Sequence, residues 1–529
     1  MAGGARPDAG DAVSRRGWVG AAILVLWAAG MGVLIRREYF QPNVERLAEA
    51  ATRVTPGAVF FAVMQGARQV GFASSTIDTV PGGITSTDYL VADLTAGGAV
   101  HRLQARTTVE VSRALRVRRF EVDVQSDSAP FHAGGRVDGD SVVVYALSSG
   151  GAPATDSQRV AIGGPILLPT LVPLAIALGE EPKVGKSYVL PVFDPTTMAP
   201  KDARISVRAE TTFVVSDSAV LDSTTMRWRG VQPDTLRAWR LSSEGTNGIG
   251  GWIDDQGRVV ATTQLGLRLE RRPYAVAFEN WRLDAEAGGQ AAPNADRDIL
   301  ETTAIAANAR VTRELPRLRV RLSGADLAGF DLSGGRQTLH GDTLTIVRED
   351  PDSLAPRFLL GTTPSSALGR EMQPAPLIES ANPQIHALAL RIRGADRDAR
   401  SVARRINAWV YDSLEKKISL GVPDALQVLK TRSGDCNEHT QLYVALARAA
   451  GIPARVAAGL AYVNGKFYYH AWPEVYLGRW VAVDPTFGEF PADAAHLRFV
   501  VGGFTRQAEL IHLIGVLRIE VLPAGTPAR

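Results

Sequence analysis

The chain contains a single cysteine, Cys436, among its 529 residues. One cysteine excludes an internal disulfide framework, a Cys-x-x-Cys redox site, and any zinc or iron–sulfur site with several cysteine ligands. The fold must therefore be stabilised by burial of apolar side chains, and 45% hydrophobic residues is ordinary for a globular protein. Cys436 itself is either a small buried apolar residue or a lone nucleophile.

The hydrophobic pattern changes along the chain, and this change predicts an α+β fold. Between about residues 58 and 285, stretches rich in Val, Thr and aromatic residues alternate in part and are separated by turn residues, which is typical of β-strands. A linker-like stretch at residues 285–296 and a smaller β segment around residues 317–350 follow. After residue 380 the apolar residues recur at three- and four-residue steps, which indicates amphipathic helices before two further strands.

One of these helices runs from about Val402 to Leu414, and Asp396 is its predicted N-cap. A chain of this length allows about three domains. We predict that residues 1–40 form a cytoplasmic tail and a single transmembrane anchor, and that residues 41–285 form a β-rich extracytoplasmic domain. Residues 286–370 are predicted to be a linker with a small β subdomain, and residues 371–529 a catalytic domain of helices and an antiparallel sheet.

The predicted anchor is the uncharged run at residues 17–35, which is long enough to cross a bilayer as a helix. A cleaved signal peptide with a site near residues 28–30 and a buried core helix are the alternatives. Arg6, Arg15 and Arg16 favour a cytoplasmic N-terminus, which places the bulk of the chain outside the cytoplasm, in the periplasm of a bacterium. A second apolar segment, residues 165–178, is interrupted by prolines and is predicted to be a short buried helix.

Several common site types are excluded. The net charge is +3 and no dense basic block is present, so we expect no nucleic-acid partner. Residues 179–187 resemble a phosphate-binding loop, but the glycines are one residue too far apart. The sequence has neither an HExxH zinc motif nor a GxSxG serine elbow. Five histidines have no companion pattern and are predicted to be surface or hydrogen-bonded core residues rather than ligands: His101, His132, His340, His386 and His512.

Cys436 lies at the predicted start of a helix that follows Gly434 and Asp435 and ends at Gly451. Free N–H groups and the helix dipole at such a position favour a thiolate, so we expect a lowered thiol pKa. A structural cysteine would more naturally lie in the middle of the apolar stripe. The position therefore favours a nucleophile.

A cysteine nucleophile needs an imidazole to take its proton and a third group to orient that imidazole. His470 and Asp484 lie on two successive predicted strands. A three-residue turn at residues 476–478 would pair Val475 with Arg479 and place His470 directly opposite Asp484 on one face. A two-residue turn would place them on opposite faces.

Three further residues lie near this pair. Trp472 shares the predicted face of His470 and could shield the site from water. Asp493 and His496 lie beyond the second strand, where we expect a polar loop without a role in the triad.

The runs GDCNEHTQLYVALARAAGIPARVAAGL and YYHAWPEVYLGRWVAVDPTFGEF resemble the transglutaminase-like (papain-related) cysteine-enzyme superfamily, over roughly residues 385–505. The resemblance implies that Cys436 is the nucleophile, His470 the general base and acid, and Asp484 the group that orients the histidine. Bacterial members similar to this chain often join an N-terminal anchor to a β-rich outer region. No calcium-loop pattern is present, and we expect neither a metal nor a cofactor.

The sequence thus predicts an inner-membrane enzyme with one N-terminal membrane helix, which acts on amide bonds of a protein or peptide substrate through an acyl-thioester on Cys436. Water as the acceptor would make it a peptidase or amidase, and an amine would make it a transglutaminase. The alternative is a non-catalytic periplasmic binding or assembly module with a degenerate fold of the same kind.

Overall fold

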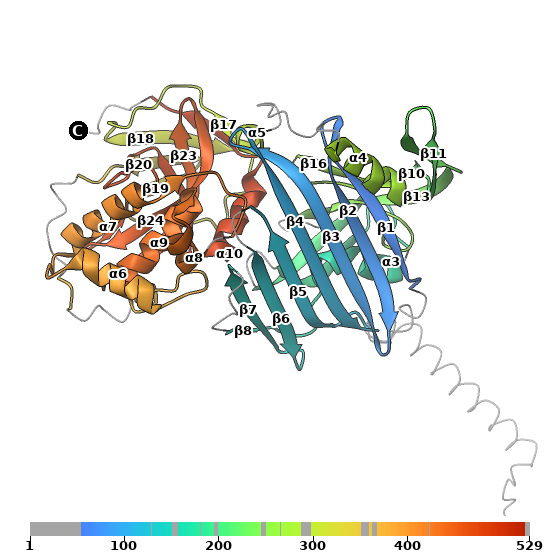
Figure 1. Ribbon diagram of the computed structural model, residues 1–529, viewed down its shortest axis with the longest axis horizontal. Coiled ribbons are helices and arrows are strands. Elements are labelled where there is room, and N and C mark those ends of the chain that lie inside the picture. The colour runs from blue at the N-terminus through green and yellow to red at the C-terminus, as the bar shows by residue number, and fades with distance from the viewer. Residues whose placement is uncertain are drawn as a thin grey trace, which may run out of the picture.

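The computed structural model describes residues 54–523, apart from gaps at residues 128–129, 151–156, 180, 195–198, 245–249, 265, 287–297, 351–358, 362–367 and 423. The structure is mostly β, with 48% strand and 21% helix. Two parts lie side by side: a large curved sheet from the first half of the chain, and a smaller part with helices and strands from the second half (Figure 1).

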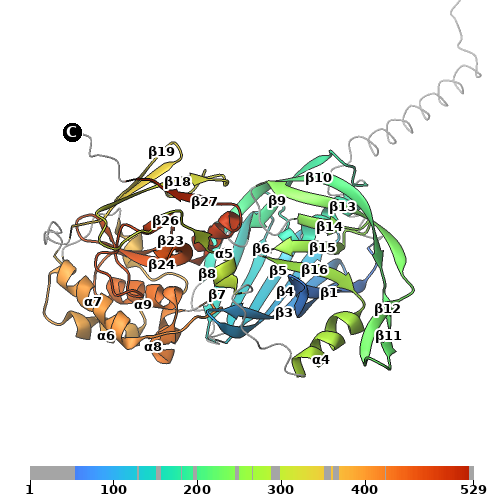
Figure 2. The ribbon, with the colours of Figure 1, turned by 90° about the horizontal axis from the view of Figure 1, so that it is seen from above.

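The large sheet has fourteen antiparallel strands in the order β8-β7-β6-β5-β4-β3-β2-β1-β16-β15-β14-β13-β10-β9. Because neighbours along most of the sheet are also neighbours in the chain, short turns suffice to connect them. Pairing of β1 with β16 joins its two halves, which curve toward each other in Figure 2. The strands are β1 (Gly57–Gln65), β2 (Arg68–Val80), β3 (Gly83–Ala96), β4 (Ala99–Ser112), β5 (Val117–Gln125), β6 (Phe131–Asp138), β7 (Val142–Ser149), β8 (Ser157–Ala161), β9 (Ser187–Asp194), β10 (Ala199–Val215), β13 (Asp234–Glu244), β14 (Gly250–Ile253), β15 (Val259–Gln264) and β16 (Leu267–Arg272), with β11 (Ser218–Asp222) and β12 (Arg227–Val231) as a separate hairpin.

A short helical segment fills the curve of this sheet. It consists of a 3-10 turn (Pro169–Leu171) and α3 (Val172–Gly179). Its buried side chains share one apolar core with residues of β4 and β5 from one half of the sheet and of β9, β10 and β13 from the other. The prediction of a short buried helix in residues 165–178 is thus confirmed. Outside the curve, α4 (Asn280–Glu286) packs on β2.

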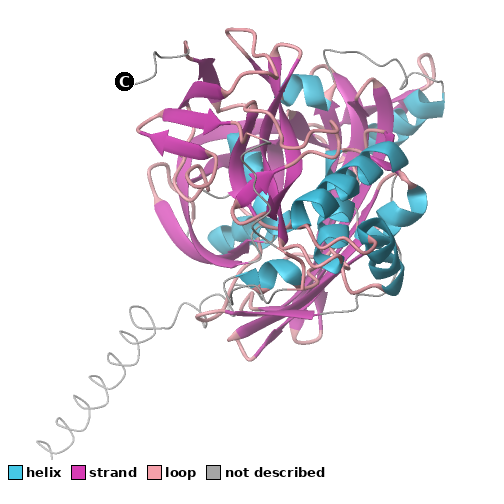
Figure 3. Ribbon diagram, turned by 90° about the vertical axis from the view of Figure 1, so that its left-hand side faces the viewer, coloured by secondary structure: helices cyan, strands magenta, loops and turns pink. Residues whose placement is uncertain are grey.

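The C-terminal part has helices on one side of a five-stranded sheet in the order β17-β24-β23-β26, with β25 also paired to β24 (Figure 3). An apolar core between the helices and the sheet joins them. The principal elements are α6 (Pro383–Arg393), α7 (Ala399–Ser413), α8 (Ala425–Thr431), α9 (Cys436–Ala449), β17 (Ile305–Ala306), β23 (Ala454–Val463), β24 (Lys466–Tyr476), β25 (Trp480–Ala482) and β26 (His496–Val501), with the short segments α5 (Ile299–Thr303), β21 (Glu415–Lys416), β22 (Ser433–Gly434), α10 (Phe504–Gln507) and a 3-10 turn (Ala508–Leu513).

A second small sheet covers the opposite face of this five-stranded sheet. Its order is β19 (Gln337–His340), β20 (Thr343–Val347), β18 (Arg317–Ser323) and β27 (Arg518–Val521). Its apolar residues share a core with β23, β24 and β26. The β segment predicted around residues 317–350 therefore exists, but it is completed by a strand from the C-terminal end of the chain.

The two parts of the molecule are in direct contact. The hydroxyl of Ser149 donates to the carbonyl of Val422 at 2.8 Å, and the main-chain N–H of Gly98 donates to Asp298 at 2.8 Å. Leu420 packs with an apolar cluster of the large sheet. The loop before α8 thus docks on the large sheet.

Two local expectations need correction. The N-cap of α7 is Asp398, whose side chain accepts from the N–H groups of Arg400 and Ser401, whereas Asp396 accepts from the N–H of Asp398 and from Arg405. Asp396 therefore supports the capping loop rather than the helix itself. The sequence predicts two strands directly after α9, and these are β24 and β25. The structure has one more strand before them, because the apolar run Ala454–Val463 forms β23.

No described helix combines the length and apolar character needed to cross a bilayer. The membrane segment predicted at residues 17–35 lies outside the described residues.

Candidate active site

Cys436 is the first residue of α9, as predicted, and Asp435 is the N-cap. The Asp435 side chain accepts from the N–H of Asn437 at 2.8 Å, and the Glu438 side chain accepts from the N–H of Asp435 at 2.9 Å, so the two acids form a capping box. Gly434 is required for this geometry, since a Cβ at residue 434 would lie 2.2 Å from the Glu438 side chain. The Gly-Asp-Cys run thus determines where the helix begins.

The Cys436 sulfur lies at an unpaired edge of β24. On that edge β17 pairs with residues 466–467 and β25 pairs with residues 474–476, so no strand covers the residues between them. The main-chain N–H of Ala471 donates a hydrogen bond to the sulfur in this gap. The thiol therefore lies beside the residue that follows His470.

The expected lowering of the thiol pKa is not observed. Burial raises the pKa of Cys436 well above its ordinary value, and the carboxyl groups of Asp435, Glu438 and Asp484 act in the same direction. The N–H of Ala471 opposes them only in part. The helix start is thus surrounded by acids, which favour the neutral thiol over the thiolate.

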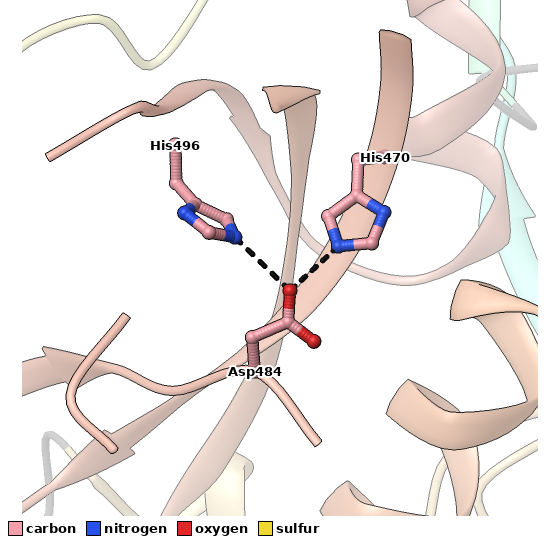
Figure 4. A group of neighbouring side chains, drawn as sticks. All are labelled: His470, Asp484 and His496. Carbon is pink, nitrogen blue, oxygen red and sulfur yellow. Dashed lines mark hydrogen bonds and ion pairs between the residues drawn. The ribbon is translucent and has the colours of Figure 1, made fainter. Parts of the chain in front are cut away.

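The imidazole that the sequence predicts to be the base lies on β24. His470 is 8% exposed, and its Nε2 donates to Oδ2 of Asp484 at 2.7 Å, so the structure brings together the predicted pair (Figure 4). The other ring nitrogen, Nδ1, points away from Asp484. With Nε2 protonated, Nδ1 is the ring nitrogen that remains able to accept a proton.

The register that brings the pair together differs from the prediction. The β24–β25 hairpin pairs Tyr476 with Trp480 and Glu474 with Ala482, so its loop begins one residue later than predicted. Continued to residue 484, this register places Asp484 opposite Trp472, and His470 becomes its diagonal neighbour. The register is shifted by two residues from the prediction. Because side chains alternate along a strand, His470 and Asp484 stay on the same face of the sheet and remain in contact.

Asp484 is fully buried and accepts four hydrogen bonds. Its Oδ1 accepts from the N–H groups of Thr486 at 2.7 Å and Phe487 at 3.1 Å, and its Oδ2 accepts from His470 and from Nε2 of His496 at 3.0 Å. Burial alone would raise the pKa of Asp484, but the two imidazoles hold it far below its usual range. Asp484 therefore stays ionised.

His496 is the residue that the sequence analysis missed. It was expected in a polar loop, but it is the first residue of β26, is 2% exposed, and bonds Asp484 through Nε2 and Asp493 through Nδ1 at 2.8 Å. The hydrophobic run that follows it in the sequence, LRFVV, is the signal that could have identified a buried strand.

Aromatic rings enclose His470. Phe487 stacks on its ring with a centroid distance of 4.7 Å and an interplanar angle of 5°, and Trp472 lies at 6.1 Å, as expected for a residue on the same face. The guanidinium carbon of Arg313 lies 5.5 Å from the centroid of the Phe487 ring. Arg313 also lines a cavity of about 600 Å³ whose wall includes Asp493, so this cavity adjoins the buried acids of the site.

His439 lies one turn after Cys436 and is fully buried. Its Nδ1 donates to the carbonyl of Asp435 at 2.7 Å, and burial lowers its pKa, so the ring is neutral. It helps to hold the start of α9.

Among the residues that the structure describes, two groups of side chains have metal-ligand geometry: His470, Asp484 and His496, and Glu489, Asp493 and His496. In the first group the hydrogen bonds already occupy both oxygens of Asp484, so an ion would have to displace a ring proton. The expectation that the site needs no metal stays a prediction.

Part of the chain is similar to a known protein family. Residues 386–485 match the model of the Transglutaminase-like superfamily, a span that contains Cys436, His470 and Asp484 but ends before His496. No curated protein has a matching sequence.

Solved structures similar to the chain are distant. A "Putative Cysteine Protease" from Cytophaga hutchinsonii is 14% identical, with 38% of this chain and 83% of that chain covered and a TM-score of 0.27. A β-barrel-like protein of unknown function from Brucella abortus is 12% identical, with 41% and 94% covered and a TM-score of 0.28. A "putative protease" from Parabacteroides distasonis is 10% identical, with 74% and 65% covered and a TM-score of 0.18. TM-scores this low establish no common fold for the whole chain.

Proposed function

Residues 386–485 are transglutaminase-like, and we propose that the protein is a thiol-dependent enzyme that transfers acyl groups from amide bonds through Cys436, His470 and Asp484. The observation that carries the proposal is the contact between two elements: the Cys436 sulfur accepts from Ala471 on β24, and the preceding residue, His470, is held by Asp484 at 2.7 Å. A nucleophile, a base and a group that orients the base are thereby brought together.

The first half of the reaction forms an acyl-enzyme. Nδ1 of His470 takes the thiol proton as sulfur attacks the amide carbonyl, and the resulting imidazolium gives that proton to the leaving amine as the carbon–nitrogen bond breaks. Asp484 stabilises the charge on the imidazolium. The N–H of Cys436 is at the first helical position, which has no intrahelical acceptor, so it can donate to the developing oxyanion.

The second half resolves the thioester. Water activated by His470 gives hydrolysis, the activity of a peptidase or amidase, and a primary amine gives cross-linking. We favour hydrolysis because water is always available. The cavity of about 600 Å³ beside Arg313 and Asp493 is of a size that can hold part of a peptide.

The protein substrate, the single membrane helix at residues 17–35 and the extracytoplasmic location belong to the same proposal. The large sheet would then hold the catalytic part away from the membrane or present substrates to it.

The experiment is an incubation of the full-length protein with a mixed peptide library, with and without a primary amine, read by mass spectrometry. We expect cleavage or deamidation, or incorporation of the amine, and none of these with Cys436→Ala. A Cys436→Ala protein that processes peptides like wild type would overturn the proposal and favour the non-catalytic module.

A further inference from the structure

A buried hydrogen-bonded chain continues the catalytic pair beyond the segment that matches the family. It runs His470–Asp484–His496–Asp493, with distances of 2.7, 3.0 and 2.8 Å. We propose that His496 is a positioning residue, a buried imidazolium that holds Asp484 from the side opposite His470 and sets the charge that the Cys436–His470 pair experiences. This inference rests on the proposed function.

The two carboxylate partners of His496 determine its protonation. Each of its ring nitrogens faces an oxygen of a different carboxylate, and a carboxylate can only accept. Both nitrogens must therefore carry hydrogen. Asp493 is itself held as a carboxylate, since the same oxygen also accepts from the N–H of Ala495 at 2.8 Å.

The electrostatics agree. Burial alone would lower the pKa of His496, but its hydrogen bonds to Asp484 and Asp493 raise it to about 9. Burial likewise acts to raise the pKa of Asp493, and the bond to His496 lowers it below its ordinary value.

The other groups that face His496 leave this assignment intact. The ring of His470 lies 5.7 Å away, and Trp472 meets the ring of His496 edge-on at 5.2 Å. Glu489, from the loop before β26, accepts from the N–H of Asp493 at 2.8 Å, and burial raises its pKa. Arg336 donates to the carbonyl of Ala492 at 3.0 Å and to that of Asp493.

The function of this hydrogen-bonded chain follows from its position next to His470. Asp484 shares one oxygen between two rings, so a cationic His496 balances its charge while His470 is neutral and able to accept a proton. The positive charge also favours loss of the proton from the Cys436 thiol. Without this charge, the thiol of Cys436 ionises at higher pH.

The single cysteine allows a test that needs no substrate. The rate of Cys436 alkylation by iodoacetamide is measured against pH on the full-length protein, for wild type, His496→Gln, Asp493→Asn, His470→Gln and the exposed control His386→Gln. We expect His496→Gln to move the pH of half-maximal alkylation up by roughly one unit or more, from the Coulomb energy of charges about 6 Å apart. Asp493→Asn keeps the ring of His496 but removes one carboxylate oxygen beside it, so it should move the pH of half-maximal alkylation less. His386→Gln should not move this pH at all.

The outcomes separate the two claims. If His470→Gln changes the profile and His496→Gln does not, the role of His496 is refuted while the proposed function stands. If neither changes it, and Cys436 reacts no faster than free cysteine, the proposed function fails as well. If His496→Gln does not fold, an unchanged profile in Asp493→Asn refutes the role. A wild-type profile that shifts on treatment with EDTA would refute the hydrogen-bonded chain in favour of a bound metal.

Discussion

The sulfur of Cys436 accepts a hydrogen bond from the main-chain N–H of Ala471, the residue that follows His470 on β24. This contact joins the start of a helix to the unpaired edge of a strand. The positions of Cys436 and His470 relative to each other therefore depend on how α9 packs against β24.

His470→Gln should lower turnover of any peptide substrate by about 10²- to 10⁴-fold, the range expected for loss of a general base. The glutamine amide can still bond Asp484 but cannot accept the thiol proton. Steady-state rates on a substrate found by the library experiment check this. His386→Gln, on the exposed face of α6, is the matched control and should be unchanged.

Asp484→Asn should lower turnover by about 10⁴-fold, as the equivalent change does in serine-protease triads. The amide presents an NH₂ group where one oxygen accepted hydrogen bonds, so a ring or backbone N–H loses its acceptor. The measurement is kcat with the protein shown to be folded by circular dichroism. A loss under tenfold would contradict the role assigned to Asp484.

The stability of the wild-type protein should fall as pH rises from about 6.5 to about 9. The pKa of His496 is raised from 6.5 to about 9 by Asp484 and Asp493, against the effect of burial, so the folded state binds this proton more tightly than the unfolded chain. Below the pKa of the unfolded state, this proton contributes its full stabilisation of about 3 kcal/mol to the free energy of unfolding. The stabilisation is lost as the pH rises through the pKa of the folded state. Urea unfolding at both ends of this range, compared with His496→Gln, checks it, because the variant should lack this part of the pH dependence.

Gly434→Ala should destabilise the C-terminal part by about 1–3 kcal/mol and reduce Cys436 alkylation. The added Cβ would collide with Glu438 and break the capping box. Gly503→Ala is the control, because a Cβ there has no atom within 4 Å. Equal melting temperatures for the two variants would contradict the account.

Glu438→Gln should be nearly neutral at pH 7 and stabilising above pH 9. Burial, with Asp435 close by, raises the pKa of Glu438 to about 9, so its carboxyl is protonated at neutral pH and an amide replaces it closely. Above that pH the wild-type group must ionise in a buried site, whereas the amide does not. Glu438→Ala removes the Glu438 half of the capping box and should cost about 1 kcal/mol at pH 7, with a smaller cost at pH 10, where the wild-type carboxyl must ionise in a buried site. Thermal unfolding of the three proteins at pH 7 and pH 10 tests both statements.

Short-range patterns were sufficient to predict several features of this protein. Gly434, Asp435 and the apolar spacing after Cys436 place the start of α9, and the prolines within residues 165–178 separate a buried helix from a membrane span. Strand alternation places His470, Trp472 and Asp484 on one face. These are properties of neighbours in the chain, where backbone sterics, caps and periodicity act.

Tertiary structure decided the rest. The loop between β24 and β25 begins one residue later than predicted, so the strand register differs by two residues. His470 and Asp484 still lie on the same face, and in contact, because two is an even number of residues. His496 meets Asp484 only because β26 pairs with β23, and β27 completes a sheet whose other strands precede the helices. The pKa of Cys436 rises because packing removes water and gathers acids around it, an effect that no local motif encodes. Burial and long-range pairing depend on which distant segments meet, and a periodicity within ten residues carries no information on that.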